Sequence, residues 1–206
     1  MVSTDEKTGM QALERLYETK PVRPGLVERV EFEYIRHGTL SLMANFDVVT
    51  GKVVSPSIGP TRTEADFVAH IDQTVDSDPY ASWIFVNDQL DTHQSAKLVE
   101  LVARRCGIHE HLGIKGKEGI LKSKQTRRQF LEDSSHRIRF VYTPRHCSWL
   151  NQVEIWFSIL ARRLLKRSSF TSVEDLQTRA LKFIEYFNSV LAKPFRWTYT
   201  GRPLQA

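Results

Sequence analysis

The sequence has little of what a secreted or membrane-inserted protein needs. Its two cysteines, Cys106 and Cys147, are too few for a disulfide framework and fit a reducing compartment. No apolar run approaches the roughly 20 residues of a membrane span, and the first residues lack the apolar core of a signal peptide. We therefore expect a cytoplasmic protein without a membrane partner.

Internal repeats, low-complexity tracts and glycine-rich phosphate loops are also absent from the sequence. Their absence argues against a repeat protein and a P-loop enzyme, and no organic cofactor is expected. What is present is a chain of 206 residues, of which 41% are hydrophobic and 10% aromatic. This composition is sufficient to fill one core, so residues 1–206 are expected to form a single domain.

Positive charge is in excess, with a net charge of +5 and an isoelectric point near 9.3, and it is unevenly distributed. The lysines and arginines gather in two stretches, Arg104, Arg105, Lys115, Lys117, Lys122, Lys124, Arg127 and Arg128, and then Arg162, Arg163, Lys166 and Arg167. Such clustering favours a polyanionic partner. The alternative for each stretch is a solvated basic surface without a partner.

Hydrophobic periodicity predicts strands that alternate with helices. Strands are expected at Val2–Thr4, Thr39–Phe46, Lys52–Ser57, Trp83–Val86 and Ile138–Tyr142, with a loop-rich stretch up to residue 35. Helices are expected at 64–76, His93–Arg105, Lys124–Leu131, Leu150–Lys166 and Val173–Val190, and two of them begin with capping-box patterns, Thr63/Asp66 and Thr171/Glu174. This order predicts an α/β fold with a mixed sheet flanked by helices.

Three acidic residues stand where a metal-dependent phosphoryl-transfer site needs them. Asp5 follows the first predicted strand, Asp88 follows the apolar strand Trp83–Val86, and Glu154 lies among the aromatic residues of a predicted helix. Mg²⁺ needs few protein ligands because substrate phosphate and water complete its coordination, so three carboxylates on different elements suffice. The alternative is that all three are ordinary caps or ion-pair partners.

Four segments, in this order, carry a family resemblance: Asp5–Glu14, Tyr34–Thr39, Phe85–His93 and Thr143–Phe157. Together they resemble the catalytic (DDE) domain of bacterial insertion-sequence transposases of the mariner-like superfamily. The resemblance implies a ribonuclease H-like fold and a DNA partner, which is cut at transposon ends and joined to target DNA. It also implies paired protomers, so a homodimer is expected, and a location on the nucleoid.

The resemblance also implies roles for particular residues. The family's catalytic acids fall on Asp5, Asp88 and Glu154, which would bind two divalent metal ions, Mg²⁺ or Mn²⁺. Asn151, one helical turn before Glu154, is similar to a family position that supports the site. His93 ends the second motif and is expected to orient Asp88 or a phosphate; the alternative is an ordinary residue at a helix start.

The chain departs from the family pattern at its start and in its middle. It begins four residues before Asp5, so the N-terminal helix-turn-helix region is expected to be absent, and the first strand to be short and weakly held. Residues 107–136 form a basic insert that is expected to bind the DNA backbone through Lys115, Lys117, Lys122, Lys124, Arg127 and Arg128. Trp149 is expected to contact DNA, whereas Trp156 and Trp197 are expected in the core.

Two other functions remain open from the sequence. One is a truncated, non-catalytic transposase remnant that at most binds DNA nonspecifically, and the other is a structure-specific nuclease that does not join strands. A zinc site is a further alternative, because cysteines and histidines occur at Cys106, His109, His111, His136, His146 and Cys147. Their spacing matches no standard zinc finger.

Overall fold

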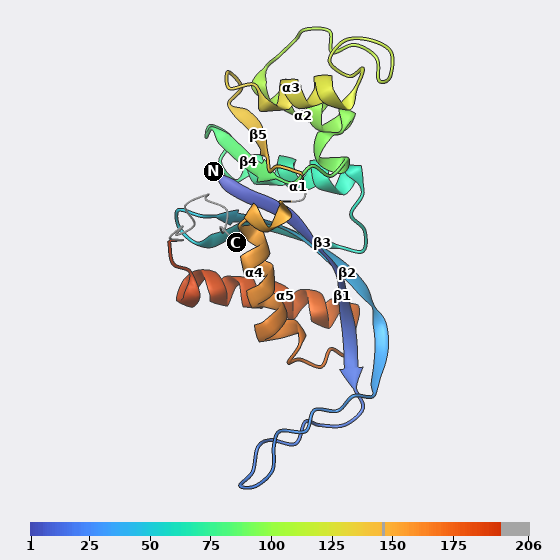
Figure 1. The fold of residues 1–206 in the computed structure, drawn as a ribbon, viewed down its shortest axis with the longest axis vertical. Helices are drawn as coiled ribbons and strands as arrows, with labels where there is room; N and C mark the ends of the chain where they lie inside the picture. Colours follow the sequence, from blue (N-terminus) through green and yellow to red (C-terminus); the bar gives the residue numbers. More distant parts are fainter. Residues whose placement is uncertain (146, 195–206) are drawn as a thin grey trace, which may run out of the picture.

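A mixed five-stranded sheet forms the centre of the computed structural model, which describes residues 1–145 and 147–194. Its strands are β1 (Val2–Arg15), β2 (Tyr34–Asp47), β3 (Lys52–Gly59), β4 (Trp83–Asn87) and β5 (Ile138–Tyr142). They lie in the order β3-β2-β1-β4-β5, and β1 is antiparallel to β2 but parallel to β4 (Figure 1). The predicted mixed α/β sheet is therefore confirmed.

Helices cover both faces of this sheet. They are α1 (Glu64–Asp76), α2 (Ala96–Cys106) and α3 (Lys124–Glu132) on one face, and α4 (Val153–Leu160) and α5 (Val173–Tyr186) on the other (Figure 1). Buried apolar side chains form one core under α1–α3 and a second core under α4 and α5, so the sheet separates two cores. None of the helices described here has the length and apolar character needed to cross a membrane.

The first strand is longer than the sequence indicates. The prediction of a strand limited to Val2–Thr4 is wrong, because pairing with the equally long β2 continues as far as Arg15. The pairing with β4 is short by contrast and involves only Val2 and Ser3 of β1. This central strand thus takes most of its backbone hydrogen bonds from one neighbour, which holds it in place despite the short ladder on the other side.

A bulge in the middle of β1 turns the strand over. The register with β2 shifts between Lys7 and Met10, where Gly9 has a φ of 66°, a conformation that favours glycine. Val2 belongs to the core under α1–α3, whereas Met10 and Ala12, also even-numbered, belong to the core under α4 and α5. Because side chains alternate along a strand, this shift reverses the buried face.

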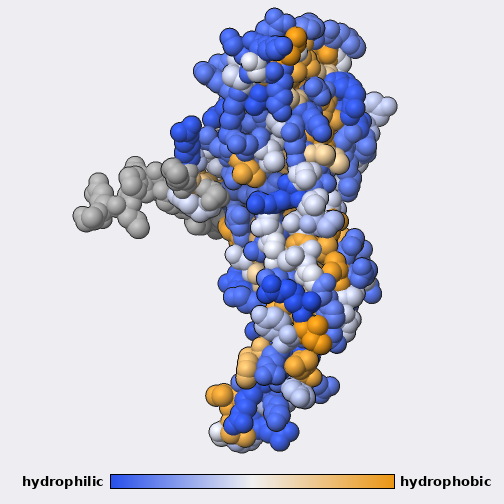
Figure 2. Space-filling model, turned by 90° about the vertical axis from the view of Figure 1, so that its right-hand side faces the viewer, coloured by the Kyte–Doolittle hydropathy of each residue, from blue (hydrophilic) through white to orange (hydrophobic). Residues whose placement is uncertain are grey.

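The segment between β1 and β2, residues 16–33, projects from the body as a long thin arm (Figure 1). Isolated backbone bridges join its two sides. Its apolar side chains are largely exposed, including Phe32 at 81% and Val27 at 79%, and Figure 2 shows apolar patches along this arm. This part of the N-terminal region agrees with the loop-rich prediction.

The helix starts follow capping rules, with one correction. Thr63 caps α1 in a complete capping box, as predicted. The box predicted at Thr171/Glu174 is wrong, because Ser172 is the N-cap of α5 and accepts a hydrogen bond from the backbone of Asp175 at 3.1 Å. Both serine and threonine stand three residues before an acid here, so the capping pattern alone does not distinguish them.

Three predicted helices are divided into shorter parts. α4 continues as a π-helical turn, Ala161–Leu165, and α5 continues as a second one, Phe187–Leu191. A 3₁₀ turn at Ser148–Leu150 precedes α4, and another at Thr92–Gln94 precedes α2. The predicted helices Leu150–Lys166, Val173–Val190 and His93–Arg105 are thus confirmed in place, and their continuous form is corrected.

The basic insert contains a tight loop before α3. Gly113 and Gly119 approach each other so closely that a Cβ on Gly113 would lie 2.2 Å from the carbonyl oxygen of Glu118. Ile114 and Glu118 also exchange backbone hydrogen bonds of 3.0 and 3.1 Å. The loop therefore has a defined shape, and the helix predicted at Lys124–Leu131 is confirmed as α3.

The tryptophans differ in their surroundings. Trp156 is fully buried, with its ring centroid 6.1 Å from that of Phe187, which confirms its predicted place in the core. Trp149 is 56% exposed in the turn before α4. Trp197 lies outside the described residues.

Candidate active site

Two of the predicted acids meet because of the register between β1 and β4. Val2 of β1 lies opposite Phe85 of the parallel strand β4. Three residues further along each strand direction, Asp5 therefore lies level with Asp88. Ligand atoms of Asp5, Asp88 and His93 all lie within 4.8 Å of one another. Asp5 lies inside β1 rather than after it, which corrects its predicted position relative to the first strand.

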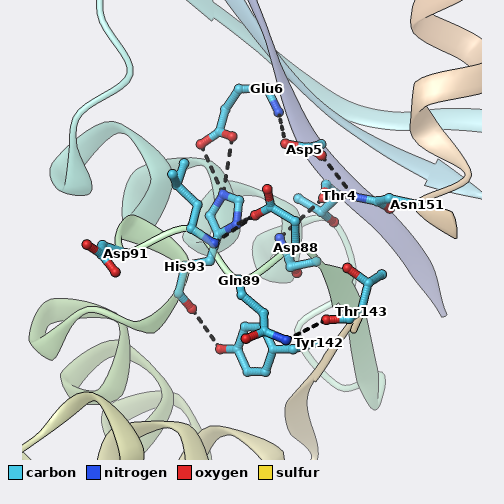
Figure 3. A network of polar contacts seen from close by, with 12 residues as sticks. Thr4, Asp5, Glu6, Asp88, Gln89, Asp91, His93, Tyr142, Thr143 and Asn151 are labelled. Atoms are coloured by element: carbon cyan, nitrogen blue, oxygen red, sulfur yellow. Dashed lines mark hydrogen bonds and ion pairs between the residues drawn. The ribbon is translucent and has the colours of Figure 1, made fainter. Parts of the chain in front are cut away.

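The carboxylate of Asp5 is buried and held by two hydrogen bonds. The backbone N–H of Glu6 donates to one oxygen at 2.8 Å, and Asn151 Nδ2 donates to the other at 3.0 Å (Figure 3). Burial raises the pKa of Asp5 to about 7, and the charge of Asp88 adds to this effect, while the hydrogen bond from Glu6 opposes it. Such a carboxylate gains strongly from an additional positive charge beside it.

His93 joins Asp88 to a further acid, Glu6. Its Nδ1 lies 2.8 Å from Asp88 Oδ1, although the N–H does not point along a well-aligned hydrogen bond. Its Nε2 lies 3.1 and 3.2 Å from the two carboxylate oxygens of Glu6 (Figure 3). Burial alone would lower the pKa of His93, but the contacts with Asp88 and Glu6 outweigh it and raise the pKa to about 10. The ring is therefore a buried imidazolium between two carboxylates.

This arrangement decides what His93 can do. The contacts with Asp88 and Glu6 favour a protonated ring, and a metal-ligating imidazole needs a free nitrogen, so His93 could join Asp5 and Asp88 as a ligand only after losing a proton. Burial would raise the pKa of Asp88, but the hydrogen bond and charge of His93, the backbone N–H of Leu90 and the charge of Lys124 together outweigh burial and lower it. His93 thus keeps Asp88 ionised and limits its orientation, while it also occupies the turn before α2.

Glu154 lies near the other two acids without contacting them. It is exposed on the first turn of α4, and its carboxylate is outside the group formed by Asp5, Asp88 and His93. Partial desolvation raises the pKa of Glu154, repulsion from Asp88 raises it further, and the charge of Lys7 opposes both. Glu154 therefore faces the same region of negative potential as Asp88.

Asn151 connects the start of α4 to β1. It is fully buried, and its Nδ2 donates to the Thr4 carbonyl at 2.9 Å as well as to Asp5, while its Oδ1 accepts from Ser3 Oγ. Ser3 Oγ in turn accepts from the backbone N–H of Val153 at 2.9 Å. These bonds hold the first turn of α4 against the part of β1 that carries the buried acid.

The acids suit a divalent cation. Carboxylate oxygens are the ligands that Mg²⁺ and Mn²⁺ prefer. Burial first, and repulsion from Asp88 second, raise the pKa values of Asp5 and Glu154, so a cation beside them would favour their ionised forms. Asp88 and Glu6 share the single positive charge of His93. Within residues 1–145 and 147–194, no other group of histidines, cysteines and acids comes together in this way. A zinc site thus has no support there, and His146 lies outside the described residues.

A hollow of about 800 Å³ opens beside Asp88. It is bordered by the residues after β4, by the start of α3 and by the residues after β5, and its lining includes Lys124, Arg128 and Arg145. Positive side chains at the edge of an acidic centre are suited to a substrate that carries phosphates on both sides of the reacting bond. The hollow is thus a candidate path for such a substrate.

The basic residues of the insert fall into two groups. Three brace the fold through the contacts Lys124 Nζ–Asp91 Oδ1 (2.5 Å), Arg127 Nε–Gln94 O (2.8 Å) and Arg128 Nη2–Glu132 Oε1 (2.9 Å). Three have exposed side chains that make no ion pair with any described residue: Lys115, Lys117 and Lys122. The second group has its full charge available for a partner, whereas the first shapes the surface.

Glu6 is the residue of this site that the sequence analysis missed. A usable signal exists, because side chains alternate along a strand and the residue after Asp5 must point to the other face of the sheet. That face carries the turn with His93. The side chain of Glu6 is only 2% exposed, and a buried carboxylate requires a partner of this kind.

A family model described as DDE superfamily endonuclease matches residues 1–177. The chain belongs to the DDE superfamily of endonucleases. This result confirms the predicted family at the level of the superfamily. No curated protein matches the sequence of this DDE endonuclease domain.

Solved structures of the Mos1 transposase are similar to this DDE endonuclease domain. A paired-end complex with the left transposon end and a pre-cleavage transpososome each have a TM-score of 0.54 and 12% identity. A mariner paired-end complex with Mn has a TM-score of 0.53 and 14% identity. Each match covers 89% of this chain but only 47% or 48% of the Mos1 chain, so the domain spans about half of that length. At this identity the likeness concerns the fold, and it confirms the predicted ribonuclease H-like architecture.

Proposed function

We propose that this DDE endonuclease domain cleaves and joins DNA strands in the transposition of an insertion sequence, with Asp5, Asp88 and Glu154 as its catalytic acids. The register of β1 and β4 carries the proposal, because it brings two acids from distant parts of the chain together beside α4. The similar Mos1 structures contain transposon-end DNA in one case and Mn in another, which supports DNA and a divalent metal as partners.

The proposal includes two divalent cations, Mg²⁺ or Mn²⁺, held by the three acids. When bound, such ions supply Lewis-acid stabilisation of the charge that develops on phosphoryl oxygens. The remaining tasks belong to the chain itself. Asn151 and the backbone of Glu6 fix Asp5, and His93 fixes Asp88 in its ionised form.

DNA would approach over the positive surface around the acids. Lys124, Arg128 and Arg145 line the hollow beside Asp88, where they would contact phosphates that flank the reacting bond. The exposed insert residues Lys115, Lys117 and Lys122, and the exposed ring of Trp149, would extend this contact. A pair of protomers acting on chromosomal DNA, and thus on the nucleoid, is part of the same proposal.

Nicking of supercoiled plasmid tests the cleavage step. The parent chain is expected to nick in Mg²⁺ or Mn²⁺ and not in EDTA, whereas Glu154→Gln, Asp88→Asn and Asp5→Asn lose at least a hundredfold in rate. Glu100→Gln is the matched control, since Glu100 is an exposed glutamate on α2 that belongs neither to the group of Asp5, Asp88 and His93 nor to the lining of the hollow. Full activity in any of the three acid variants, after circular dichroism confirms folding, would refute the assignment of that residue.

Assays on the same purified protein distinguish the transposase from two alternative functions. A folded parent that binds DNA but does not nick it would identify a non-catalytic remnant. A parent that nicks plasmid but does not join a precut oligonucleotide with a free 3′-hydroxyl to target DNA would identify a nuclease without strand transfer. Joining that requires all three acids supports the transposase.

A further inference from the structure

We propose that a second groove, between the end of α4 and the end of α5, binds a single strand of nucleic acid. The groove has a volume of about 1100 Å³ and is lined on one side by Arg162, Arg163 and Arg167. Lys193 completes its positive lining. None of its lining residues borders the hollow beside Asp88.

The groove lies at the end of α4 opposite to the catalytic acids. Glu154 is on the first turn of α4, and Arg163 follows nine positions later in the π-helical turn. At about 1.5 Å per helical residue, the two are separated by roughly 13 Å along the helix axis. A strand in this groove is therefore distinct from the phosphodiester that would react at the acids.

The positive charges of the groove are not neutralised by the protein. Arg162 donates through Nε to the Ser158 carbonyl at 3.2 Å, which leaves its terminal nitrogens available. Arg163, Arg167 and Lys193 make no ion pair within the described part of the chain, and the groove has no acidic residue in its lining. A concave basic surface without counter-charges attracts polyanions.

The opposite wall of the groove favours a single strand over a duplex. Phe183, Tyr186, Phe187 and Val190 line it from one face of the α5 helix and the π-helical turn that continues it. Tyr186 is 50% exposed, and Val190 is 59% exposed. Phe187 is only 6% exposed and belongs to the core, so Tyr186 is the ring on which an unpaired base can stack while arginines hold the phosphates. A duplex presents sugars and phosphates on its outside, so it would leave this apolar wall without a partner.

The backbone supplies an independent indication. Both π-helical turns of the described chain border this groove, one with Arg162 and Arg163 and the other with Val190. π-helical turns are rare, and they frequently occur at functional sites. In Figure 1 the ends of α4 and α5 lie on the same side of the sheet, away from α2 and α3.

Fluorescence anisotropy with a labelled oligo-dT 20-mer tests the proposal on the full chain in EDTA, where no cleavage occurs. The triple variant Arg162→Gln/Arg163→Gln/Arg167→Gln is expected to bind at least tenfold more weakly than the parent. Its plot of log affinity against log salt should flatten by about 0.7 for each lost phosphate contact. Tyr186→Ala is expected to lose about tenfold through the missing base stack.

Lys166→Gln/Lys182→Gln is the matched control, because both lysines are exposed on the same two segments but lie outside the groove lining. It should retain parent affinity apart from a small general charge effect. Unchanged oligo-dT binding in the folded triple variant would overturn the proposal, and so would a loss confined to duplex DNA.

A second measurement does not depend on any substitution. Photocrosslinking of the parent chain to an oligo-dT that contains 5-iododeoxyuridine should attach the base to Tyr186, as mapped by mass spectrometry. Crosslinks only to peptides around Asp88 would contradict the groove. Since both experiments run without metal, they separate failure of this groove from failure of the proposed cleavage.

Discussion

His93 links two acids of the candidate site. It lies between Glu6 and Asp88 with a fully buried side chain, and its single positive charge is shared between the two carboxylates. Asp5 and Glu154 keep raised pKa values beside it. The site thus contains two acids that contact the same histidine and two acids whose raised pKa values a bound cation would lower.

Glu6 is expected to act as a positioning residue through His93. In Glu6→Gln the imidazolium keeps a hydrogen-bond acceptor but loses a negative neighbour, so Asp88 should be held less firmly. We expect a fall of at least tenfold in plasmid nicking and a weaker apparent affinity for Mn²⁺ in calorimetry. The loss of a buried charged partner should also lower the free energy of unfolding by about 1–3 kcal/mol in urea titrations.

The pair Glu14 and His37 supplies the control for this prediction. These residues also form a carboxylate–imidazole contact on β1 and β2, at 2.6 Å, but they are partly exposed and lie away from the acids. Glu14→Gln should leave nicking and Mn²⁺ affinity unchanged. In a double-mutant cycle, Glu6→Gln/His93→Gln should be little worse than His93→Gln alone; fully additive losses would show that Glu6 acts by another route.

Asp5 and His93 should each make the stability of the metal-free protein fall as the pH rises, whereas His70, whose pKa burial lowers to about 4, opposes them up to about pH 6.5. Folding raises the pKa of Asp5 from 3.8 to about 7, so between these values the folded state binds a proton that the unfolded chain has released. Folding raises the pKa of His93 from 6.5 to about 10, so its stabilising contribution is complete below about pH 6.5 and is lost towards pH 10.

Urea unfolding in EDTA between pH 5 and pH 9 measures this effect. The free energy of unfolding should decrease by at most roughly 1.4 kcal/mol per pH unit for each group. Below pH 7 the stability of the parent relative to that of Asp5→Asn should fall as the pH rises, and above pH 7 the two should change alike. A parent whose stability increases between pH 5 and pH 7, by the same amount as that of Asp5→Asn, would contradict the raised pKa of Asp5.

Among the elements, the sequence predicted those with a clear period and missed those defined by their partners. The apolar run of β4 and the Thr63 capping box were sufficient to locate β4 and α1. The length of β1 was not predictable, because its polar residues and Gly9 resemble a turn until β2 pairs with them across a bulge. The π-helical turns that extend α4 and α5 arise from packing at the helix ends and leave no such period.

The site residues divide in the same way. Asp88 follows an apolar strand and Glu154 lies beside buried aromatic residues, so local patterns point to both. The place of Glu6 depends on which face of the sheet the turn with His93 covers, and that is a tertiary contact. In the sequence, the only sign of this contact is that Glu6 is an acidic residue without a predicted partner.

The loop of the basic insert offers a prediction at the element scale. Lys115, Lys117 and Lys122 are exposed without ion pairs, and the close approach of Gly113 to Gly119 holds the loop in shape. Lys115→Gln/Lys117→Gln/Lys122→Gln should weaken binding to duplex DNA and flatten its salt dependence by about 0.9 per lost contact. Lys124→Gln is expected to weaken DNA binding and also to lower stability slightly, because Lys124 both lines the hollow beside Asp88 and bridges Asp91. Unchanged duplex affinity in the triple variant would refute the predicted role of the insert.

In the whole molecule, the acids stand where the two cores meet. Asp5 belongs to β1, Asp88 follows β4, and Glu154 begins α4 on the opposite face of the sheet from α1–α3. A cation bound by all three would therefore connect parts that β1 and β4 join through a very short ladder. Its binding energy would add directly to the stability of the folded state.

Thermal unfolding with and without Mn²⁺ tests this coupling. At a Mn²⁺ concentration a hundredfold above its dissociation constant, the folded state gains about 2.7 kcal/mol, which corresponds to a rise in Tm of roughly 5–10 °C for a chain of this size. Asp88→Asn should lose most of the rise, and Glu100→Gln should keep it. An equal rise in Asp88→Asn and in the parent would place the cation elsewhere.

The bulge at Gly9 has a consequence for how this architecture can change. It separates β1 into an inner half, with Asp5 and Glu6, and an outer half that leads into the arm. Alterations in arm length or in the outer half need not propagate to the acids, because the reversal of faces is already absorbed between Lys7 and Met10. We therefore expect that the arm can be shortened or exchanged without moving Asp5 and Glu6.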